Sequence, residues 1–469
     1  MLIRRIILSR PSVAKLVTAT LTFLYNTSKI TFLILFLPFE EESGGGCKQV
    51  GGQTRLPFLW LLLAHYSAVL LRKILIFCPN ACVCAYFVVP LYPKWWLRSH
   101  LNANIYQKII STMRYLTLEK AIEAWRKLQP LTENDQQKLS RRFTIDFNYN
   151  SNHIEGNTLT YGQTEILLLF GKVIGEANVK DIQDMTASNV TLKMMSEEAL
   201  IKETPLTVNF IRTLHHTLLR EDYTVYKQLH NGQQTSYVIH AGQYKTRPNS
   251  VITRYGDRFE YASPEETPAL MTDLVDWYNQ AEKEGKYSPV ELAALFHYRY
   301  IRIHPFEDGN GRIARLLVNY ILTRHDYPMI VVRSRNKGEY LEVLHAADLF
   351  VGNIPSDGAH ASLQEIRPFV QYFKRLVANE VYTNVCFLTE HDENLWWYDG
   401  EKVEFRSSNY SKILMLMMTE PVLTLEHIQQ ELGINMSAIK KLVNQLQDKH
   451  YIERGHSDGS WRVFITPSM

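Results

Sequence analysis

The apolar residues between Tyr115 and Tyr372 recur at intervals of three and four, and this period constrains the fold more than any other feature. Leu292, Leu295 and Phe296 illustrate the spacing. Because it places apolar side chains on one face of an α-helix, it predicts a stack of amphipathic helices. We therefore expect a mainly α fold, and 469 residues are enough for two or three domains.

One interval departs from this period. Residues 236–261 are rich in Tyr, Val, Ile and Thr and contain turn-forming residues at 248–249 and 255–257. This composition predicts a β-hairpin inserted in the helical domain. Three prolines mark expected helix starts, where proline costs little: Pro264, Pro268 and Pro289.

Charge and cysteine usage divide the chain into two populations. Residues 1–112 carry twelve Lys/Arg and three Glu, a net charge of +9, whereas the remaining residues sum to −6. Four of the five cysteines also lie in residues 1–112, and only Cys386 follows. The main body therefore has no disulfide framework, as expected of a protein in a reducing cytoplasm.

The first 112 residues support two interpretations. They contain apolar runs at 30–39, 56–71 and 74–90, but charged residues, proline or asparagine interrupt or separate the runs. No methionine occurs between Met1 and Met113, where the helical period begins, which favours a start site assigned too early. The alternative is a membrane-associated hairpin, so contact with a membrane is expected only if this segment is natively translated.

The stretch from His304 to Arg315 reads His-Pro-Phe-Glu-Asp-Gly-Asn-Gly-Arg-Ile-Ala-Arg and lies between two helical patterns. Its Gly-Asn-Gly turn must therefore open the second helix, whose first backbone N–H groups form an anion site. Gly309 and Gly311 allow close approach to a phosphate. Arg312 and Arg315, three residues apart, are expected to share one helix face and to reach the same anion.

Two further side chains complete this predicted phosphate site. Asp308 offers the hard oxygen that Mg²⁺ prefers, and Mg²⁺ normally uses only one or two carboxylates together with substrate phosphates. His304 is a suitable general base. The stretch thus supplies a base, a metal ligand and an anion site without a side-chain nucleophile. Neither a Walker sequence nor a strand-borne Gly-x-Gly-x-x-Gly accompanies it.

This stretch resembles the Fic family, whose motif is His-Pro-Phe-x-Asp/Glu-Gly-Asn-Gly-Arg-x-x-Arg, and every specified position is present. The resemblance implies a helical Fic core that transfers AMP from Mg-ATP to a target protein's hydroxyl, releasing pyrophosphate. It also implies a role for each residue: His304 as base, Asp308 as the Mg²⁺ ligand, Gly309, Asn310 and Gly311 on the phosphates, and Arg312 and Arg315 on the β and γ charge.

An upstream segment, Ser151-Asn152-His153-Ile154-Glu155-Gly156, resembles the family's inhibitory pattern Ser/Thr-x-x-x-Glu-Gly/Asn. The resemblance implies that Glu155 forms an ion pair with Arg315 and withdraws it from the ATP γ-phosphate. ATP would then bind with its α-phosphate misaligned, so the ground state would be inactive. Read alone, Ser151 to Gly156 would be an ordinary helix end.

Residues 242–261, called the flap below, correspond in order and character to the hairpin on which Fic proteins lay an extended target segment. A purely structural hairpin is the alternative. Tyr340 and Asn336 are candidates for the adenine pocket, with core packing as the alternative for Tyr340. We expect residues 113–200 to form a helical region that carries the inhibitory pattern and residues 201–378 to form the catalytic core.

The C-terminal residues are predicted to form a separate module. Residues 379–405 are polar and aromatic and are expected to be a linker, whereas 406–469 contain three helical patterns followed by a hairpin. This order is typical of a winged helix-turn-helix domain. Such a domain binds DNA through its last helix, at 436–449, where candidate contacts are Lys440, Lys441, Asn444, Gln445, Gln447 and Lys449. Protein binding or homodimerisation is an equal alternative.

The functional hypothesis is a protein adenylyltransferase that modifies a Ser, Thr or Tyr hydroxyl of a target and of itself and is inhibited by its own Glu155. Two alternatives stay open: a DNA-binding regulator with a Fic sensor domain, and a Fic enzyme that transfers another phosphate-containing group. Asp308 and the complete Arg-x-x-Arg favour ATP and AMP transfer.

Overall fold

The structure is a computed structural model that describes residues 17–25, 28–36, 117–228, 234–252, 258–455 and 459–468. Strands β1 (Val17–Tyr25) and β2 (Ser28–Phe36) form an antiparallel hairpin in a unit of their own. The other residues of 1–112 lie outside the described ranges. The two interpretations of this segment, an early start site and a membrane-associated hairpin, therefore stay predictions. Within the described ranges, every helix is too short or too polar to cross a membrane.

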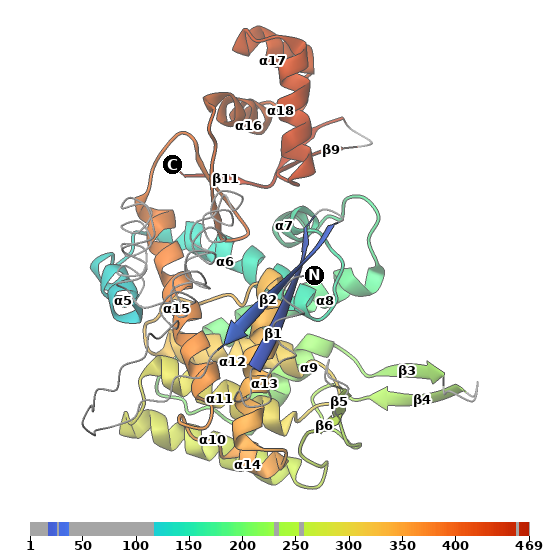
Figure 1. Ribbon diagram of the computed structural model, residues 1–469, viewed down its shortest axis with the longest axis vertical. Helices are drawn as coiled ribbons and strands as arrows, with labels where there is room; N and C mark the ends of the chain where they lie inside the picture. Colours follow the sequence, from blue (N-terminus) through green and yellow to red (C-terminus); the bar gives the residue numbers. More distant parts are fainter. Residues whose placement is uncertain are drawn as a thin grey trace, which may run out of the picture. The chain divides into compact units, whose positions relative to one another are not determined.

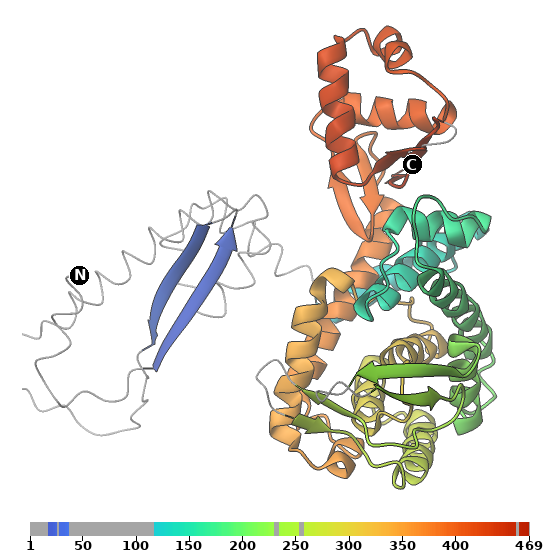
Figure 2. The same cartoon turned by 90° about the vertical axis from the view of Figure 1, so that its right-hand side faces the viewer.

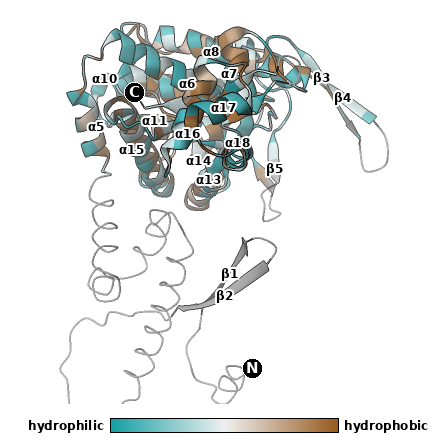
Figure 3. Ribbon diagram, turned by 90° about the horizontal axis from the view of Figure 1, so that it is seen from above, coloured by the Kyte–Doolittle hydropathy of each residue, from teal (hydrophilic) through white to brown (hydrophobic). Residues whose placement is uncertain are grey.

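The predicted mainly α fold is confirmed in the larger unit, and Figure 3 shows apolar and polar residues interleaved along its helices. The helices before the C-terminal module are α5 (Leu118–Lys127), α6 (Glu133–Ile154), α7 (Tyr161–Phe170), α8 (Val179–Ala199), α9 (Val208–Leu219), α10 (Thr267–Glu284), α11 (Pro289–Ile303), α12 (Asn310–Arg324), α13 (Lys337–Val351), α14 (Pro355–Ala359) and α15 (Arg367–Thr389), with a 3₁₀ turn η3 (Ser334–Asn336) before α13.

Local side chains define where these helices begin. At α11 the Ser288 hydroxyl accepts a hydrogen bond from the Glu291 amide, and the Glu291 carboxylate accepts one from the Ser288 amide. Pro289 occupies the first turn, where a missing N–H costs nothing. Pro268 lies at the equivalent place in α10, and Pro264 lies in the turn before it. The predicted helix starts are therefore confirmed.

Helices α11 and α12 form the centre of the fold. Nearly all of their residues are buried, so they are covered on every side instead of on one face. Helix α11 packs against α10, α14 and α15, and α12 packs against α6, α8 and α9. The short connection between them, residues 304–309, is therefore held within a rigid framework (Figure 1).

The predicted boundary at residue 200 does not separate two cores. One apolar cluster contains Phe147 and Leu192 from the first range together with Leu214 and Phe296 from the second. Because these side chains are buried in one cluster, residues 117–389 form a single packed body. The inhibitory segment is part of this body and not an appended domain.

The β prediction for 236–261 was wrong in extent. The structure contains two antiparallel hairpins: β3 (Tyr223–Gln228) with β4 (Gln234–Ile239), and β5 (Ser250–Ile252) with β6 (Arg258–Glu260). The first begins thirteen residues before the predicted start. The alternating Tyr-Thr-Val-Tyr of β3 is β-forming, but it directly follows the helical pattern of α9. The expected turn at 255–257 lies outside the described residues.

The predicted linker 379–405 is instead ordered. Its first part continues α15 to Thr389, and the rest forms strands β7 (Leu395–Tyr398) and β8 (Glu401–Glu404), joined by β11 (Thr466–Pro467) in one antiparallel sheet. Trp396 of β7 is buried in the apolar cluster of the C-terminal module. This burial shows that the module begins near Leu395 and not at 406, because polar flanking residues hid its first strand.

The three helices and the hairpin expected after residue 406 are present. They are α16 (Ser408–Thr419), α17 (Leu425–Leu432), α18 (Met436–Asp448) and the pair β9 (Ile452–Arg454) and β10 (Trp461–Val463), grouped together in Figure 2. On α18 the side chains of Ile439, Val443 and Leu446 are buried, as the predicted face requires. DNA binding by α18 stays a prediction.

Candidate active site

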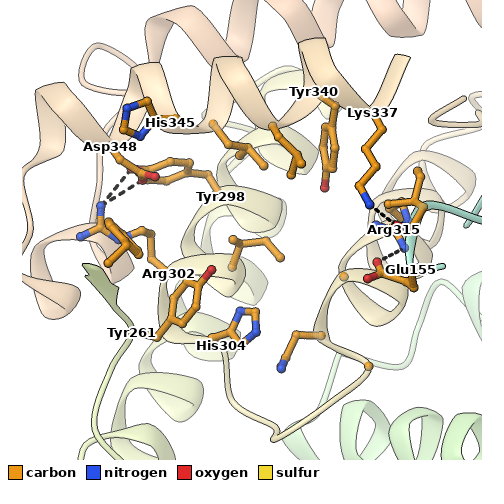
Figure 4. A pocket seen from close by; sticks show the side chains of 18 of the residues that line it. Glu155, Tyr261, Tyr298, Arg302, His304, Arg315, Lys337, Tyr340, His345 and Asp348 are labelled. Carbon is orange, nitrogen blue, oxygen red and sulfur yellow. Dashed lines mark hydrogen bonds and ion pairs between the residues drawn. The ribbon is translucent and has the colours of Figure 1, made fainter. Parts of the chain in front are cut away.

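A cavity of about 540 Å³ opens between the start of α12, the flap and α13. Figure 4 shows how its side chains face one another: His304 and Tyr261 on one side, Tyr340 opposite, and Arg315 with Glu155 at one end. The cavity is lined by Ile154, Glu155, Phe259, Tyr261, Tyr298, Ile301, Arg302, His304, Glu307, Asp308, Gly309, Asn310, Gly311, Arg315, Lys337, Gly338, Tyr340, Leu341, Glu342, Leu344, His345 and Asp348.

His304 lies where α11 ends, in the left-handed backbone region with φ of 50°. Its ring stacks on Tyr261 of the flap, with centroids 3.9 Å apart and planes inclined by 11°. Its Nδ1 has no hydrogen-bond partner among the described residues. Burial, followed by the charge of Lys245, lowers its pKa to about 3. The imidazole is therefore neutral near pH 7 and can accept a proton.

The Gly-Asn-Gly turn opens α12 as predicted. Gly309 caps the helix with φ of 75°, a conformation that glycine adopts at little cost. The Asn310 side chain donates to the Phe306 carbonyl at 2.7 Å and accepts from the Phe306 amide at 3.0 Å. Asn310 thus braces the loop with both polar atoms and also lines the cavity, and its role on a phosphate stays a prediction. The first amides of α12 point to an anion site at this end of the cavity.

Asp308 lines the cavity, and its Oδ2 accepts a hydrogen bond from the Tyr223 hydroxyl at 2.7 Å. Burial alone would raise its pKa, but Arg312, Tyr223 and the Gly309 amide outweigh burial and lower it. The carboxylate is thus ionised and exposed enough to meet a cation. No group of three or more His, Cys, Asp or Glu is placed to hold a metal ion in the described residues. Asp308 therefore fits Mg²⁺ only as the protein's single carboxylate beside substrate phosphates.

The two arginines of the motif point to different groups. Arg312 points to Asp308, with Nη2 3.3 Å from Oδ2, and does not line the cavity. Arg315 lines it. Without a bound ligand the two arginines thus make different contacts, Arg315 with the cavity and Arg312 with Asp308, and a shared anion stays a prediction.

The expected ion pair between Glu155 and Arg315 is present. Glu155 follows the last turn of α6, and its Oε1 lies 2.5 Å from Arg315 Nη2. Arg315 also donates to the Ser151 hydroxyl from Nε at 3.0 Å and to the Ser151 carbonyl from Nη2 at 2.9 Å. Gly156, with φ of +99°, ends the segment. Burial alone would raise the pKa of Glu155. The charge and the hydrogen bond of Arg315 outweigh burial, so the pKa is lowered.

Gly311 allows this contact. A Cβ at this position would collide with the Glu155 carboxylate. Gly311 is helical, so of the two glycines only Gly309 adopts a positive φ.

Of the two adenine-pocket candidates, only Tyr340 lines the cavity. Tyr340 is buried, and its hydroxyl lies 2.8 Å from Nε2 of His297. Its side chain therefore both packs in the core and lines the cavity. Asn336 is exposed in η3 and lies outside the lining, which corrects that prediction. The next residue, Lys337, lines the cavity instead of Asn336. Its Nζ donates to the Ile154 carbonyl at 2.6 Å.

Several contributors were not found from the sequence. Tyr261 stacks on His304, His215 stacks on Phe306 at 3.7 Å between centroids, and Lys245 donates to the His304 carbonyl. Each lies at least 43 residues before His304, and no local pattern connects them to the loop. The only available signal was the position of Tyr261 and Lys245 within the flap.

Comparison with known proteins agrees with this architecture. Residues 205–322 match the Fic/DOC family model. The crystal structure of a Fic domain containing signaling protein from Bacteroides thetaiotaomicron is 52% identical, with a TM-score of 0.54, over 57% of this chain and 95% of that one. The chain belongs to the Fic family.

Curated relatives of this Fic protein include protein adenylyltransferase fic-1 of Caenorhabditis elegans, 30% identical over 50% of this chain and 40% of its own length. Protein adenylyltransferase Fic of Nematostella vectensis is 29% identical over 48% of this chain and 45% of its own length. The chain thus spans less than half the length of these two relatives, and their likeness is confined to part of each protein.

Proposed function

We propose that this Fic protein is a protein adenylyltransferase that transfers AMP from Mg-ATP to a Ser, Thr or Tyr hydroxyl of a target protein and of itself. The observation that carries the proposal is the pairing of a neutral imidazole, His304, with a helix N-terminus inside one cavity. That pairing places a proton acceptor beside an anion site. The curated relatives named as adenylyltransferases support the same chemistry.

In the proposed reaction the neutral His304 accepts the proton of the target hydroxyl. The hydroxyl oxygen forms a bond to the α-phosphorus as the bond to the β-phosphate oxygen breaks, and pyrophosphate leaves. The amides at the start of α12 bind phosphate oxygens, and Arg315 offers a cation once it is free of Glu155. Asp308 would hold Mg²⁺, which supplies further charge neutralisation when bound. Positioning and electrostatics thus provide most of the acceleration.

The ground state of this enzyme is inhibited in our proposal. Arg315 makes hydrogen bonds to Glu155 and Ser151, all on the inhibitory segment. These contacts use the donors that would otherwise meet the γ-phosphate. ATP entering the cavity must therefore compete with a carboxylate and a carbonyl for the same guanidinium.

The test uses ATP labelled separately at the α and γ phosphates, with the Glu155→Gly variant as the active form. We expect label on protein from the α position only, and its loss in the Glu155→Gly/His304→Ala double variant while ATP binding persists. Label from the γ position would indicate a kinase. Undiminished transfer without His304 would remove the proposed base.

A further inference from the structure

The segment between the two hairpins, residues 240–249, runs along the catalytic loop and binds its backbone at several points. The Lys245 amide donates to the Pro305 carbonyl at 2.9 Å, and the Asn249 side chain donates to the Phe306 carbonyl at 2.7 Å. Thr246 donates to the Glu307 carboxylate from its hydroxyl at 3.0 Å. The loop that carries the base is therefore held by a neighbouring segment as well as by its own helix.

Lys245 makes the central contact of this segment. Its Nζ donates to the carbonyls of Ile303 and His304, each at 2.9 Å. These carbonyls lie at the end of α11, where the helix supplies no further N–H groups. The side chain is buried, 3% exposed, and no carboxylate forms an ion pair with it among the described residues. Burying an ammonium group without a paired carboxylate costs free energy. This cost indicates that the contact with the two main-chain oxygens has a function.

The backbone of His304 explains why such a contact is needed. A histidine with φ of 50° is in the left-handed region, which is strained for a residue that carries a Cβ. This conformation turns the chain sharply out of α11 and sets the direction of the imidazole. Without a donor at the two carbonyls, the turn could relax and the ring would move away from the cavity.

We propose that Lys245 is a positioning residue for catalysis, which holds His304 in its left-handed conformation through the carbonyls of Ile303 and His304. This role rests on the proposed function of His304 as the base. The Lys245 side chain is buried and does not line the cavity, so it is placed behind the catalytic loop and not against a bound nucleotide. It acts by donating hydrogen bonds to the two carbonyls, and its positive charge strengthens these bonds.

The protonation of Lys245 gives the proposal a pH signature. Burial lowers its pKa to about 8, and the charge of Glu266, beside the start of α10, partly opposes this. The other titratable group interacting with it is His304, at the end of α11. As pH rises through about 8 the ammonium group loses a proton and its charge, so the hold on the loop weakens. The rate should therefore fall on the alkaline side.

The experiment measures self-modification with α-labelled ATP in the Glu155→Gly background. Lys245→Met keeps the apolar stem and removes the donor; Lys245→Arg keeps a cation that holds its proton to higher pH than lysine. Lys283→Met, on the exposed surface of α10, is the matched control. We expect Lys245→Met to lower the maximal rate by roughly 10- to 100-fold, with the half-saturating ATP concentration changed less than about threefold.

Lys245→Arg should restore most of that rate and should lack the decline above pH 8 that its parent shows. The comparison isolates Lys245, because pH acts on ATP, metal and acceptor equally in both proteins. Equal maximal rates in Lys245→Met and its parent would overturn the proposal. A parallel loss of ATP binding in both variants would overturn it too, since that indicates a general structural role.

Two further outcomes are also decisive. If Lys245→Met does not fold, the Arg variant alone decides: an alkaline decline as steep as in the parent would refute the role of Lys245. If the Glu155→Gly parent itself transfers no AMP, the proposed function fails first, and the failure is recognisable because it is independent of residue 245.

Discussion

In the proposed mechanism, Arg315 is the residue on which inhibition and catalysis converge. Its guanidinium donates to Glu155 and to Ser151, and it lies in the same cavity as His304. A planar group with donors on two edges can exchange a carboxylate for a phosphate without moving its stem. The inhibitory contact is therefore a competition for one set of donors.

This competition predicts the effect of removing Glu155. Glu155→Gly should raise self-modification and target modification well above wild type, by about tenfold for each 1.4 kcal/mol of inhibitory bias removed. The gain should disappear in the Arg315→Ala background, because only the competition model couples the two positions. Rates of α-label incorporation for the four proteins provide the measurement. A gain that persists undiminished without Arg315 would refute the brake.

Three histidines predict how stability depends on pH. Burial lowers the pKa of His215 to about 4 and is the largest cause that lowers those of His297 and His304 to about 3. Their folded-state pKa values lie below the unfolded value of about 6.5, so the unfolded chain binds protons first as pH falls. Stability should be full above about pH 6.5 and decline below it, by about 1 kcal/mol per histidine at pH 5.5. Urea unfolding at pH 7.5, 6.5 and 5.5 would measure this; equal free energies would contradict it.

At the scale of elements, a buried ionic network fixes the helix that ends at Glu155. Arg333, after α12, forms ion pairs with Asp146 of α6 at 2.8 Å, Glu380 of α15 at 2.8 Å and Asp399 at 3.1 Å. Asp399 lies in the β7–β8 turn and also accepts from Asn150 of α6 at 2.6 Å. The turn of the β7–β8 pair thus contacts α6, the helix that ends next to Glu155, through buried charged and polar side chains.

This network predicts that Asp399 supports inhibition from a distance. Asp399→Ala leaves Arg333 and Asn150 short of an acceptor, and breaking a buried pair costs several kcal/mol. The loss of these contacts should loosen α6 and weaken the contact between Glu155 and Arg315. Self-modification should therefore rise a few-fold in the wild-type background and stay unchanged with Glu155→Gly. The exposed Glu401→Ala, which removes only a surface pair with Arg335, is the control. Equal rates for Asp399→Ala and Glu401→Ala would contradict the prediction.

At the scale of the whole molecule, the C-terminal module and the Fic core share a boundary near residue 390. Trp396 is 1% exposed and donates from Nε1 to the Ser411 hydroxyl at 3.0 Å. Phe464 packs so closely on Gly162 of α7 that a Cβ there would collide with its ring. The module therefore contains its own core and also touches the region that carries the inhibitory segment.

The placement of Trp396 predicts which fragment folds. Residues 390–469 should unfold cooperatively, whereas 406–469 should be less stable by about 3–5 kcal/mol, because the latter lacks a large buried aromatic side chain and two strands. Thermal unfolding of the two fragments by circular dichroism is the measurement. Equal stability of the two would restore the boundary expected at 406.

Removing the module should leave catalysis intact, since every proposed catalytic group lies before residue 390. A protein ending at Thr389 should self-modify at least as fast as the full chain, because Asp399 and Phe464 no longer support α6 and α7. A folded but inactive truncation would show that the module helps to build the active site.

The sequence by itself determined the chemistry of the loop and the identity of its helices. His304, Asp308 and Arg315 are close in the chain, and a helix start at Gly309 follows from local turn chemistry, so short-range rules were sufficient. The inhibitory Glu155 was recognised through family resemblance, and its contact with Arg315 is observed at 2.5 Å. The helical period likewise predicted α11, α12 and α18, since amphipathic spacing is a property of each segment alone.

Only the tertiary structure decided which side chains surround the base and where the domains divide. Lys245, His215 and Tyr261 reach His304 and its loop from other elements, and nothing in their own neighbourhoods indicates that approach. The different contacts of Arg312 and Arg315 depend on what packs on each side of α12. Strand β7 is paired with β11, whose Thr466 lies opposite Trp397, 69 residues earlier, because a sheet is completed by partners distant in sequence.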